Sequence, residues 1–308
     1  MASINILAVS NGVGITRDVE LLTEILKQAG HEVISNHIFR YEPQRQVDLN
    51  IFLERFKPEL FSSAVKNILV PNQEWFESGW VPMLKYFHTI FTKTRFADDV
   101  FKNIGCRTEF ISFTSQDRYL PDIKKDDFHY IHVAGKSVQK QTEIVMKTWE
   151  NNPGFPQLTV IQDPKFFRPR TSRRNINFMS DRLSDDVLKV LQNNHAIHVC
   201  SSETEGFGHY IVEAMSCKSV VLVTGAPPMT ELVTPDRGMY IKYVNQEPMR
   251  LSYRFLISPE SLEMAVTQTL ISDDNVKREM GENARRFFLE NDAFFRNRVV
   301  EAVANVLQ

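Results

Sequence analysis

The sequence predicts an α/β protein built from two consecutive, doubly wound domains. Its first 38 residues read as a buried strand, a glycine loop, an amphipathic helix and a second strand. The same order returns between residues 128 and 161, after a polar segment at residues 117–127 that contains Pro121 and four consecutive charged residues. Strand, glycine loop, helix and strand in this order are typical of a parallel α/β domain, and the polar segment is typical of a linker.

In the first domain, the apolar run Ile4–Ser10 predicts the opening strand. Apolar residues spaced three or four apart after Gly14 predict a helix that stops at Gly30, and His31–Ile38 reads as the next strand. Weaker strand signals follow at residues 49–53, 68–70, 87–91 and 107–111. We expect this domain to span residues 1–125.

The second domain is expected over residues 126–290. Its predicted strands lie at residues 128–133, 158–161, 176–178, 196–200, 220–223 and 239–241, with a helix at residues 184–192. The tail then reads as three helices: one opened by Ser258 and Pro259, a second near Val276, and a third within residues 291–308. We treat residues 291–308 as a separate C-terminal helix.

Composition and charge exclude several classes of protein. The chain has 308 residues, with 36 basic against 38 acidic side chains, so it lacks the basic excess of nucleic-acid-binding proteins, and nucleic acid is disfavoured as a partner. Its three cysteines show no paired spacing, which argues against a disulfide framework and against a structural metal site. No signal peptide precedes the first strand, and no apolar run reaches the ~18 residues that span a bilayer.

We therefore expect a cytoplasmic protein with at most a peripheral membrane contact. The residues that could make such a contact are Trp80, Leu84, Phe87 and Phe91 together with neighbouring cations, although core packing is the favoured interpretation of these aromatic and apolar side chains.

One segment, Ser201–Leu232, combines the residue types that a sugar-nucleotide site needs. Gly206 and Gly208 allow the backbone to approach a ligand closely and to turn into a helix. The amino end of that helix presents free N–H groups to phosphate or sugar hydroxyls. Glu205 before the helix and Glu213 within it can accept hydrogen bonds from separate hydroxyls of one extended ligand. Each piece alone is better explained as a turn followed by a helix with a favourable first-turn charge.

The complete string resembles the donor-site signature of glycosyltransferase family four, which has the GT-B fold and a Glu-x7-Glu motif. The matching residues are Glu205, Gly206, Phe207, Gly208, Glu213, Ala214, Met215, Glu231 and Leu232. The resemblance implies two Rossmann-like domains that face a cleft, with the last helix crossing back to the first domain. It also implies that Glu205 contacts the donor sugar, that Glu213 takes the ribose hydroxyls, and that the amides of Phe207, Gly208, His209 and Tyr210 face the sugar and phosphates.

A second stretch, His132–Lys140, resembles the cationic motif G-R-x-x-x-x-K-G of the same family. Lys136 stands where arginine is more usual, and Lys140 lies at the expected start of a helix. A lysine carries the charge of arginine without its bidentate fork. By this resemblance, the donor diphosphate is held by Gly135, Lys136, Ser137 and Lys140, and the catalytic residues are Glu205, Lys136 and Lys140.

The sequence departs from the family pattern at a few positions. Gln141 replaces the glycine that follows Lys140, Lys218-Ser219-Val220 replaces a Gly-x-Pro after the helix, and Cys200 replaces a common proline. Since the replacements at positions 200 and 218–220 remove no ligand group, we expect them to affect packing more than chemistry.

The first domain resembles the family only in outline, as a strand, a glycine loop and a helix. We assign Gly12 and Gly14 of that loop to donor binding. Three residues are candidates for the acceptor side: Glu74 in a Pro-Asn-Gln-Glu-Trp loop, His88 as a general base among aromatic residues, and His132 at the end of a strand. For the two histidines a packed structural role is the alternative.

The resemblance implies a retaining glycosyltransferase, hexosyltransferase-like, that moves a sugar from a nucleoside diphosphate sugar to a carbohydrate-type acceptor. A UDP- or GDP-linked donor is expected, and the acceptor (a glycan, a lipid-linked sugar or another molecule) is not identified by the sequence. No cofactor and no bound metal are expected. A sugar-nucleotide epimerase of the same fold and a catalytically inactive nucleotide-sugar-binding protein are the alternatives.

Metal independence leads to the first prediction. No Asp-x-Asp motif occurs in the sequence, and the resemblance implies that cationic side chains and helix amides stabilise the leaving diphosphate. We expect turnover to be unchanged by EDTA, measured as release of nucleoside diphosphate. Loss of turnover in EDTA that magnesium or manganese restores would contradict this expectation.

Overall fold

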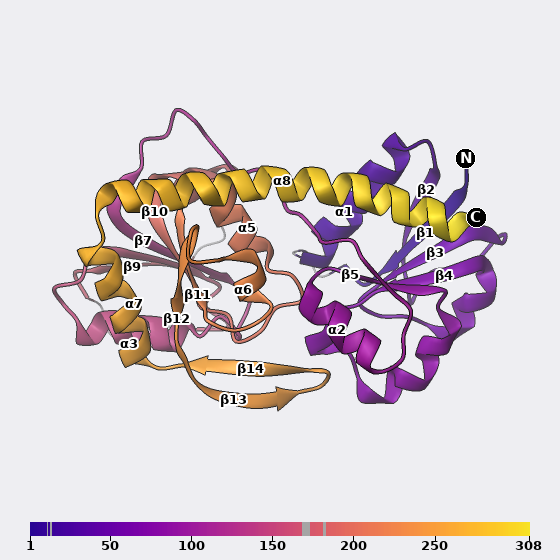
Figure 1. The fold of residues 1–308 in the computed structure, drawn as a ribbon, viewed down its shortest axis with the longest axis horizontal. Helices are drawn as coiled ribbons and strands as arrows, with labels where there is room; N and C mark the ends of the chain where they lie inside the picture. Colours follow the sequence, from indigo (N-terminus) through magenta and orange to yellow (C-terminus); the bar gives the residue numbers. More distant parts are fainter. Residues whose placement is uncertain (11, 13, 168–172, 181–182) are drawn as a thin grey trace. The chain divides into compact units, whose positions relative to one another are not determined.

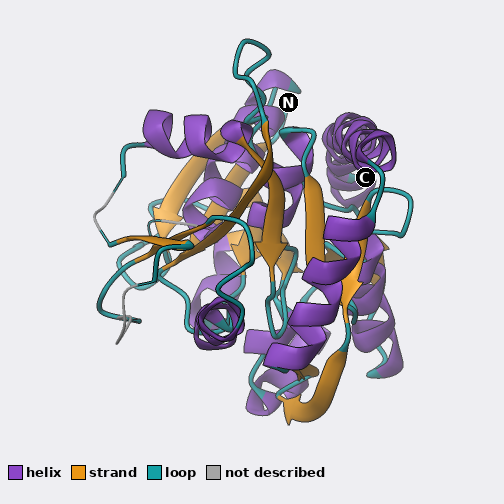
Figure 2. Ribbon diagram, turned by 90° about the vertical axis from the view of Figure 1, so that its left-hand side faces the viewer, coloured by secondary structure: helices purple, strands orange, loops and turns teal. Residues whose placement is uncertain are grey.

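The computed structural model describes residues 1–10, 12, 14–167, 173–180 and 183–308, so two positions of the predicted glycine loop, Asn11 and Val13, lie outside the described residues. The chain divides into two compact units. The first comprises Met1–Ser115, Met249–Ser252 and Asn291–Gln308; the second comprises Gln116–Pro248 and Tyr253–Glu290. Each unit contains a six-stranded parallel sheet with helices packed on it (Figures 1 and 2), so the predicted α/β class is confirmed.

The first unit has strand order β2-β1-β3-β4-β5-β6. Its strands are β1 (Ser3–Ala8), β2 (Glu32–His37), β3 (Val47–Leu53), β4 (Ala64–Val70), β5 (Thr89–Thr92) and β6 (Thr108–Phe110). Its helices are α1 (Gly14–Gln28) and α2 (Arg95–Asn103), with short 3-10 segments η1 (Pro58–Ser63), η2 (Gln73–Trp75) and η3 (Ser78–Tyr86). The six strands lie where the apolar runs predicted them, within a few residues at each end.

The aromatic and apolar side chains that the sequence offered for a membrane contact, those of Trp80, Leu84, Phe87 and Phe91, pack in the core. Leu84, Phe87 and Phe91 are buried, and the ring of Trp80 lies 5.3 Å from that of Phe56. Core packing, the interpretation that the sequence favoured for these residues, is therefore confirmed. Among the described residues, no helix is both long and apolar enough to cross a bilayer.

A chain of asparagine side chains crosses the first sheet. Asn36 of β2 donates to Asn5 of β1, Asn5 donates to Asn50 of β3, and Asn50 donates to Asn67 of β4, at 3.1 to 3.4 Å. Asn67 in turn donates to the carbonyl of Phe61 at 3.0 Å. Asn5, Asn50 and Asn67 are buried, and buried amides must be hydrogen-bonded. The asparagine ladder therefore holds four strands in one register, since a shift of one residue would leave buried amides unpaired.

The second unit has strand order β12-β11-β10-β7-β8-β9. Its sheet strands are β7 (Asp126–Gly135), β8 (Leu158–Gln162), β9 (Ile176–Met179), β10 (His195–Cys200), β11 (Val220–Thr224) and β12 (Gly238–Ile241). Its helices are α3 (Thr142–Asn151), α4 (Asp185–Asn194), α5 (His209–Ser216), α6 (Met229–Leu232) and α7 (Pro259–Ile271). The apolar residues of α3, α7 and the central strands pack around Trp149 into a single core.

The first segment of the first unit ends at Ser115, ten residues before the domain boundary expected at residue 125. Arg118 explains the difference. Its buried guanidinium donates to Gln192 at 2.6 Å and to Asp185 at 2.8 Å, and its backbone N–H donates to Ser216. The segment predicted to be a linker is thus anchored to α4 and α5 of the second unit.

The C-terminal region also differs from the expectation. The second and third predicted tail helices form one helix, α8 (Asp274–Leu307), because no glycine or proline interrupts the chain after Gly281. Asn291, a residue that often ends a helix, instead donates from its side chain to the carbonyl of Phe113 at 2.6 Å. The hairpin of β13 (Tyr243–Met249) and β14 (Ser252–Ile257) was not predicted. Its turn, Met249–Ser252, belongs to the first unit, and Arg250 of this turn forms an ion pair with Glu77.

Two residues that replace glycines of the family pattern have left-handed backbone conformations. Gln141 has φ 53° and Lys218 has φ 58°, so each stands where glycine carries no steric penalty. Gln141 is buried and compensates with its side chain: it donates to the carbonyls of Ser201 and Phe255 and accepts from the N–H of Ile257, at 2.9 to 3.2 Å.

The asparagine ladder leads to the second prediction. Asn50→Leu should lower the free energy of unfolding of the first unit by about 2 to 3 kcal/mol, because it leaves buried partners on both neighbouring strands unsatisfied. Asn36→Ala, at the half-buried end of the ladder, should cost about 1 kcal/mol or less. Urea unfolding followed by tryptophan fluorescence measures both, and equal effects of the two variants would show that the ladder does not stabilise the sheet.

Gln141 leads to the third prediction. Gln141→Ala keeps the left-handed strain and removes three hydrogen bonds, so it should destabilise the protein by about 2 to 3 kcal/mol. Gln141→Gly removes the same bonds but relieves about 1 kcal/mol of strain, and should therefore be the milder variant. Urea unfolding of both variants checks the order; an alanine variant more stable than the glycine variant would contradict it.

Candidate functional site

The strand order of the second unit locates its candidate site. The chain enters the sheet at β7, then places β8 on one side and β10 on the other, so the winding direction reverses between β7 and β10. In open parallel sheets, ligands bind beyond the carboxyl ends of the strands at such a reversal. The loops at this point are Lys136–Gln141 after β7 and Ser201–Gly208 after β10, which are the two segments that the sequence singled out.

Hydrogen bonds join these two loops directly. The N–H of Glu203 donates to the carbonyl of Gln139 at 2.9 Å, and the Ser201 hydroxyl donates to the carbonyl of Lys140 at 2.7 Å. The side chain of Gln141 adds its bond to the carbonyl of Ser201. The loops therefore form one rigid surface, although about 60 residues separate them in the sequence.

Lys140 and Glu205 pair across this surface. The Lys140 ammonium lies 2.6 Å from Glu205 Oε1, and the two side chains are 14% and 18% exposed. The same ammonium lies 3.1 Å from the centroid of the Tyr210 ring, which adds a cation–π contact. The structure thus brings together two residues that the sequence assigned to catalysis, with their opposite charges in contact and open to solvent.

Ser202 orders the carboxylate side of this group. Its hydroxyl donates to Glu205 Oε1 at 2.6 Å and also contacts the hydroxyl of Tyr210, which accepts from the Ser202 N–H at 3.2 Å. Burial, reinforced by the nearby negative charge of Glu205, raises the pKa of Tyr210 well above its ordinary value. The Tyr210 side chain therefore stays neutral, and its ring packs against the Lys140 ammonium.

Helix α5 begins at His209, as the glycine pattern predicted. Gly208 has φ 107°, and a Cβ on it would lie 2.9 Å from Ile211 Cδ1, so glycine is required at this position. The ring of Phe207 is buried and contacts His209 edge to face. The amino end of α5, the positive end of its dipole, directly follows the loop that holds Glu205.

Glu213 lies one turn further along α5 and is half-buried. Its carboxylate accepts from Gln192 at 3.4 Å, and Gln192 accepts from the buried Arg118. Burial raises the pKa of the Cys200 thiol at the end of β10. The charge of Lys140 lowers that pKa, and the charges of Glu205 and Glu213 raise it. Lys140, Glu205 and Glu213 therefore lie on segments that follow the carboxyl ends of β7 and β10.

The remaining residues of the cationic motif are placed differently. Lys136 is exposed, directly after the end of β7 at Gly135, which has φ 57°. Ser137 accepts from the N–H of Gln139, and its carbonyl accepts from the side chain of Gln162 at 2.8 Å. Lys136 is thus a solvent-facing cation next to the Lys140 group, and its role in catalysis remains a prediction.

Two of the predicted acceptor-side residues, His132 and His88, form hydrogen bonds within the protein. His132 is fully buried; its Nδ1 lies 2.8 Å from the carbonyl of Val199 and its Nε2 lies 3.0 Å from the Thr142 hydroxyl. Burial lowers the pKa of His132 to about 4, so it stays neutral and packs. His88 is exposed, but it precedes β5 and accepts from the N–H of Asn67, at the edge opposite to the carboxyl ends of the strands. Neither placement supports contact with an acceptor.

The other first-unit candidates lie at the carboxyl edge. Glu74 is buried in η2, shortly after the end of β4. Gly12 has φ 70° and its N–H donates to the Thr16 hydroxyl, while Gly14 is the first residue of α1. Their binding roles stay predictions.

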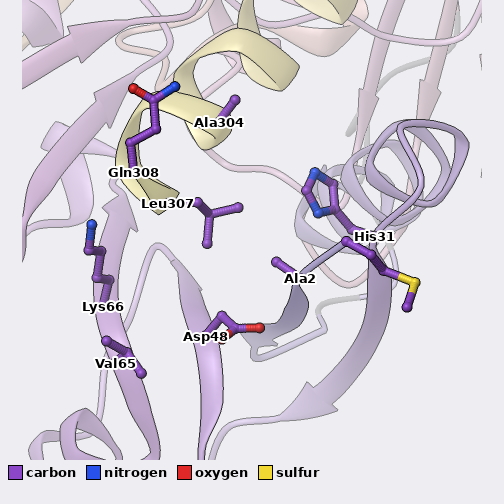
Figure 3. A pocket seen from close by; sticks show the side chains of 9 residues that line it. Ala2, His31, Asp48, Val65, Lys66, Ala304, Leu307 and Gln308 are labelled. Carbon is purple, nitrogen blue, oxygen red and sulfur yellow. The ribbon is translucent and has the colours of Figure 1, made fainter.

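A hollow of about 450 Å³ lies elsewhere in the first unit, at the amino edge of the sheet (Figure 3). Its lining includes His31, Asp48 and Lys66, together with the last turn of α8, where Lys66 donates to the carbonyl of Val306. Asp48 accepts from both the N–H and the hydroxyl of Ser3. Asp48 and Lys66 thus hydrogen-bond to the start of β1 and to the last turn of α8, and we assign the hollow no role. Among the described residues, no group of three His, Cys, Asp or Glu side chains is arranged to hold a metal ion.

Residues 171–287 match the family model for "Glycosyl transferases group 1". This range contains the Glu205–Glu213 segment and Glu231. No curated protein sequence matches the chain.

Solved structures resemble the chain over nearly its whole length. A glycosyltransferase from Rickettsia africae has a TM-score of 0.75 at 13% identity, over 99% of this chain and 98% of that one. A sucrose-phosphate synthase from Thermosynechococcus elongatus has 0.73 at 13%, over 99% of both chains. Anabaena HepE in complex with UDP-glucose has 0.73 at 13%, over 99% of this chain and 100% of that one. The resemblance predicted from the sequence is confirmed at this level: the chain has the GT-B fold of these glycosyltransferases, and its residues 171–287 match the glycosyl transferases group 1.

Proposed function

We propose that this protein is a retaining, metal-independent glycosyltransferase that transfers a hexose from a nucleoside diphosphate donor to a carbohydrate-type acceptor. The observation that carries the proposal is the Lys140–Glu205 pair at the strand reversal between β7 and β10, beside the amino end of α5. An ammonium, helix N–H groups and two carboxylates at one strand end are what a diphosphate linked to a ribose and a sugar requires.

A UDP-linked donor is the first candidate. Anabaena HepE was solved with UDP, with UDP and glucose, and with UDP-glucose. Its fold matches this chain over 98% or more of the residues, so the same class of donor is supported here by analogy. A GDP-linked donor remains the second candidate.

The pairing of Lys140 with Glu205 suggests how the donor enters. Without a donor, each charge neutralises the other at 2.6 Å. A diphosphate offers Lys140 more negative charge than one carboxylate does, so donor binding should draw the ammonium to phosphate. Glu205 is then released to accept hydrogen bonds from the sugar hydroxyls. Ser202 remains in contact with Glu205 Oε1 and limits how far the carboxylate can move.

Lys140 would act most strongly as the reaction proceeds. The bond between the anomeric carbon and the diphosphate oxygen breaks, and the electron pair leaves with the nucleoside diphosphate. The acceptor hydroxyl oxygen bonds to the same face of the anomeric carbon, and its proton passes to the departing phosphate oxygen. Negative charge on that phosphate grows in the transition state, where a positioned cation lowers the barrier.

The fourth prediction separates the charged residues by role. Lys140→Ala should lower kcat by about 10²- to 10³-fold with a smaller effect on donor affinity. Glu213→Ala should weaken UDP binding by about 10- to 150-fold, because it removes one hydrogen bond to a charged group. Glu205→Gln should bind UDP at least as tightly as the wild type, since it frees Lys140, and should lose affinity only for the intact donor. Titration calorimetry and steady-state rates measure these effects.

Lys147→Ala is the matched control, because Lys147 is an exposed lysine of α3 outside the site. The assignment is wrong if Lys140→Ala slows turnover no more than Lys147→Ala does, or if Glu213→Ala binds UDP as the wild type does. NMR of the product's anomeric proton tests retention. Conversion of the donor to an epimer without any acceptor would favour the epimerase, and tight donor binding with no turnover would favour an inactive binding protein.

A further inference from the structure

The first sheet reverses its winding in the same way as the second. The chain enters at β1 and places β2 on one side and β3 on the other, so the reversal lies between β1 and β3. By the rule that located the donor site, a ligand is expected beyond the carboxyl ends of these two strands. The residue that follows β3 at this point is Glu54, which the sequence had not singled out.

Glu54 is held in a strained turn. It has φ 62°, a left-handed conformation that glutamate rarely adopts, and the N–H of Arg55 donates to the carbonyl of Leu53 at 2.7 Å around it. A three-residue turn with positive φ at its centre is rare and costly. The Glu54 N–H also donates to the carbonyl of Val70, which ties the turn to β4. Because strain of this kind persists where function requires a side chain in a fixed direction, it points to a role for the carboxylate.

A chain of polar contacts fixes that carboxylate. Asn72, in the loop after β4, donates to Glu54 Oε2 at 2.9 Å and accepts from the ammonium of Lys93 at 3.1 Å. Lys93, which follows β5, is itself paired with Asp18 of α1 at 2.6 Å, and both are buried. The Lys93 charge is thus neutralised within the unit, while the Glu54 side chain is 21% exposed. The other carboxylate oxygen, Glu54 Oε1, lies 3.9 Å from the guanidinium of Arg55, so the network presents a carboxylate and a cation side by side to solvent.

An exposed aromatic ring lies on the same loop as Asn72. Trp75 follows in η2, its N–H donates to the carbonyl of Asn72, and its side chain is 40% exposed. The flat face of an indole packs on the C–H face of a sugar ring, whereas a carboxylate and an amide accept and donate hydrogen bonds to its hydroxyls. The Glu54–Arg55 pair carries no net charge, so it offers a phosphorylated ligand no excess of positive charge. The combination fits an uncharged sugar.

We infer that Glu54, positioned by Asn72 and accompanied by Trp75, binds an uncharged sugar as the acceptor of the reaction. This inference rests on the proposed function, and it adds the residues and the charge of the acceptor. Glu54 binds hydroxyls of the sugar, and Asn72 is a positioning residue that acts through Glu54.

Saturation-transfer difference NMR tests the inference on the full chain with the methyl glycosides of glucose, galactose, mannose and N-acetylglucosamine. At least one glycoside should give signals with the wild type, and glucose 6-phosphate should bind no more tightly than that glycoside. Glu54→Gln and Trp75→Ala should reduce the signals at least fivefold. Glu59→Gln and Tyr86→Ala are the matched controls, an exposed glutamate and an exposed tyrosine of the same unit, and should leave the signals unchanged.

Glu54→Gly provides a second variant that keeps the fold, because glycine adopts the left-handed conformation freely. It should have an equal or higher Tm and should still lose the sugar signals. Persistence of the signals in both Glu54 variants, or their absence from the wild type with all four glycosides, would overturn the inference. UDP calorimetry on the same samples reports the second unit separately: failure of the wild type to bind UDP would refute the proposed donor site, whereas UDP binding with unchanged sugar signals in the Glu54 variants would refute only the acceptor assignment.

Discussion

The side-chain amide of Gln141 is the contact on which the functional edge of the second unit depends. It bonds to the loop after β10 and to strand β14 while its own backbone opens α3, so one residue joins three segments that are distant in the sequence. A glycine would adopt the same backbone conformation without strain but could form none of these bonds. The direction in which Lys140 leaves the backbone is set by this neighbour, and the position of the ammonium follows from it.

Both units contain an internal ion pair at the carboxyl edge of the sheet, and the exposure of each pair separates their roles. The side chains of Lys93 and Asp18 are 4% and 1% exposed, so that pair can be separated only at a large desolvation cost. Lys140 and Glu205 are 14% and 18% exposed, and solvent or a ligand can reach both. The first pair therefore belongs to the scaffold, whereas the second can exchange its partner. A lysine–carboxylate ion pair thus stabilises the fold in one unit and, under the proposed function, exchanges its partner for a ligand in the other.

Much of the fold was predictable because apolar runs mark parallel strands that are buried on both faces. The turn and helix that carry Glu205 and Glu213 were predictable as well, since the spacing of this string lies within one turn and one helix. The direct pairing of Lys140 with Glu205 was not, because 65 positions separate them and only the sheet order brings them together. Glu54 and Arg118 carried no local pattern, since the role of each comes from a turn or a partner on another element. The β13–β14 hairpin was missed because β13 has polar, largely exposed residues at its centre and a proline near its end, so it forms no apolar run.

The asparagine ladder of the first sheet has a direction. Asn5, Asn50 and Asn67 each accept through the side-chain oxygen and donate through the NH2 group, so the bonds run one way from Asn36 to the carbonyl of Phe61. An aspartate at a central position could accept but not donate, and a glutamine would displace both groups by one methylene. Single substitutions at the central positions are therefore poor intermediates in evolution. The ladder should be kept whole or replaced whole by apolar side chains, so that Asn5, Asn50 and Asn67 would vary together among relatives of this protein.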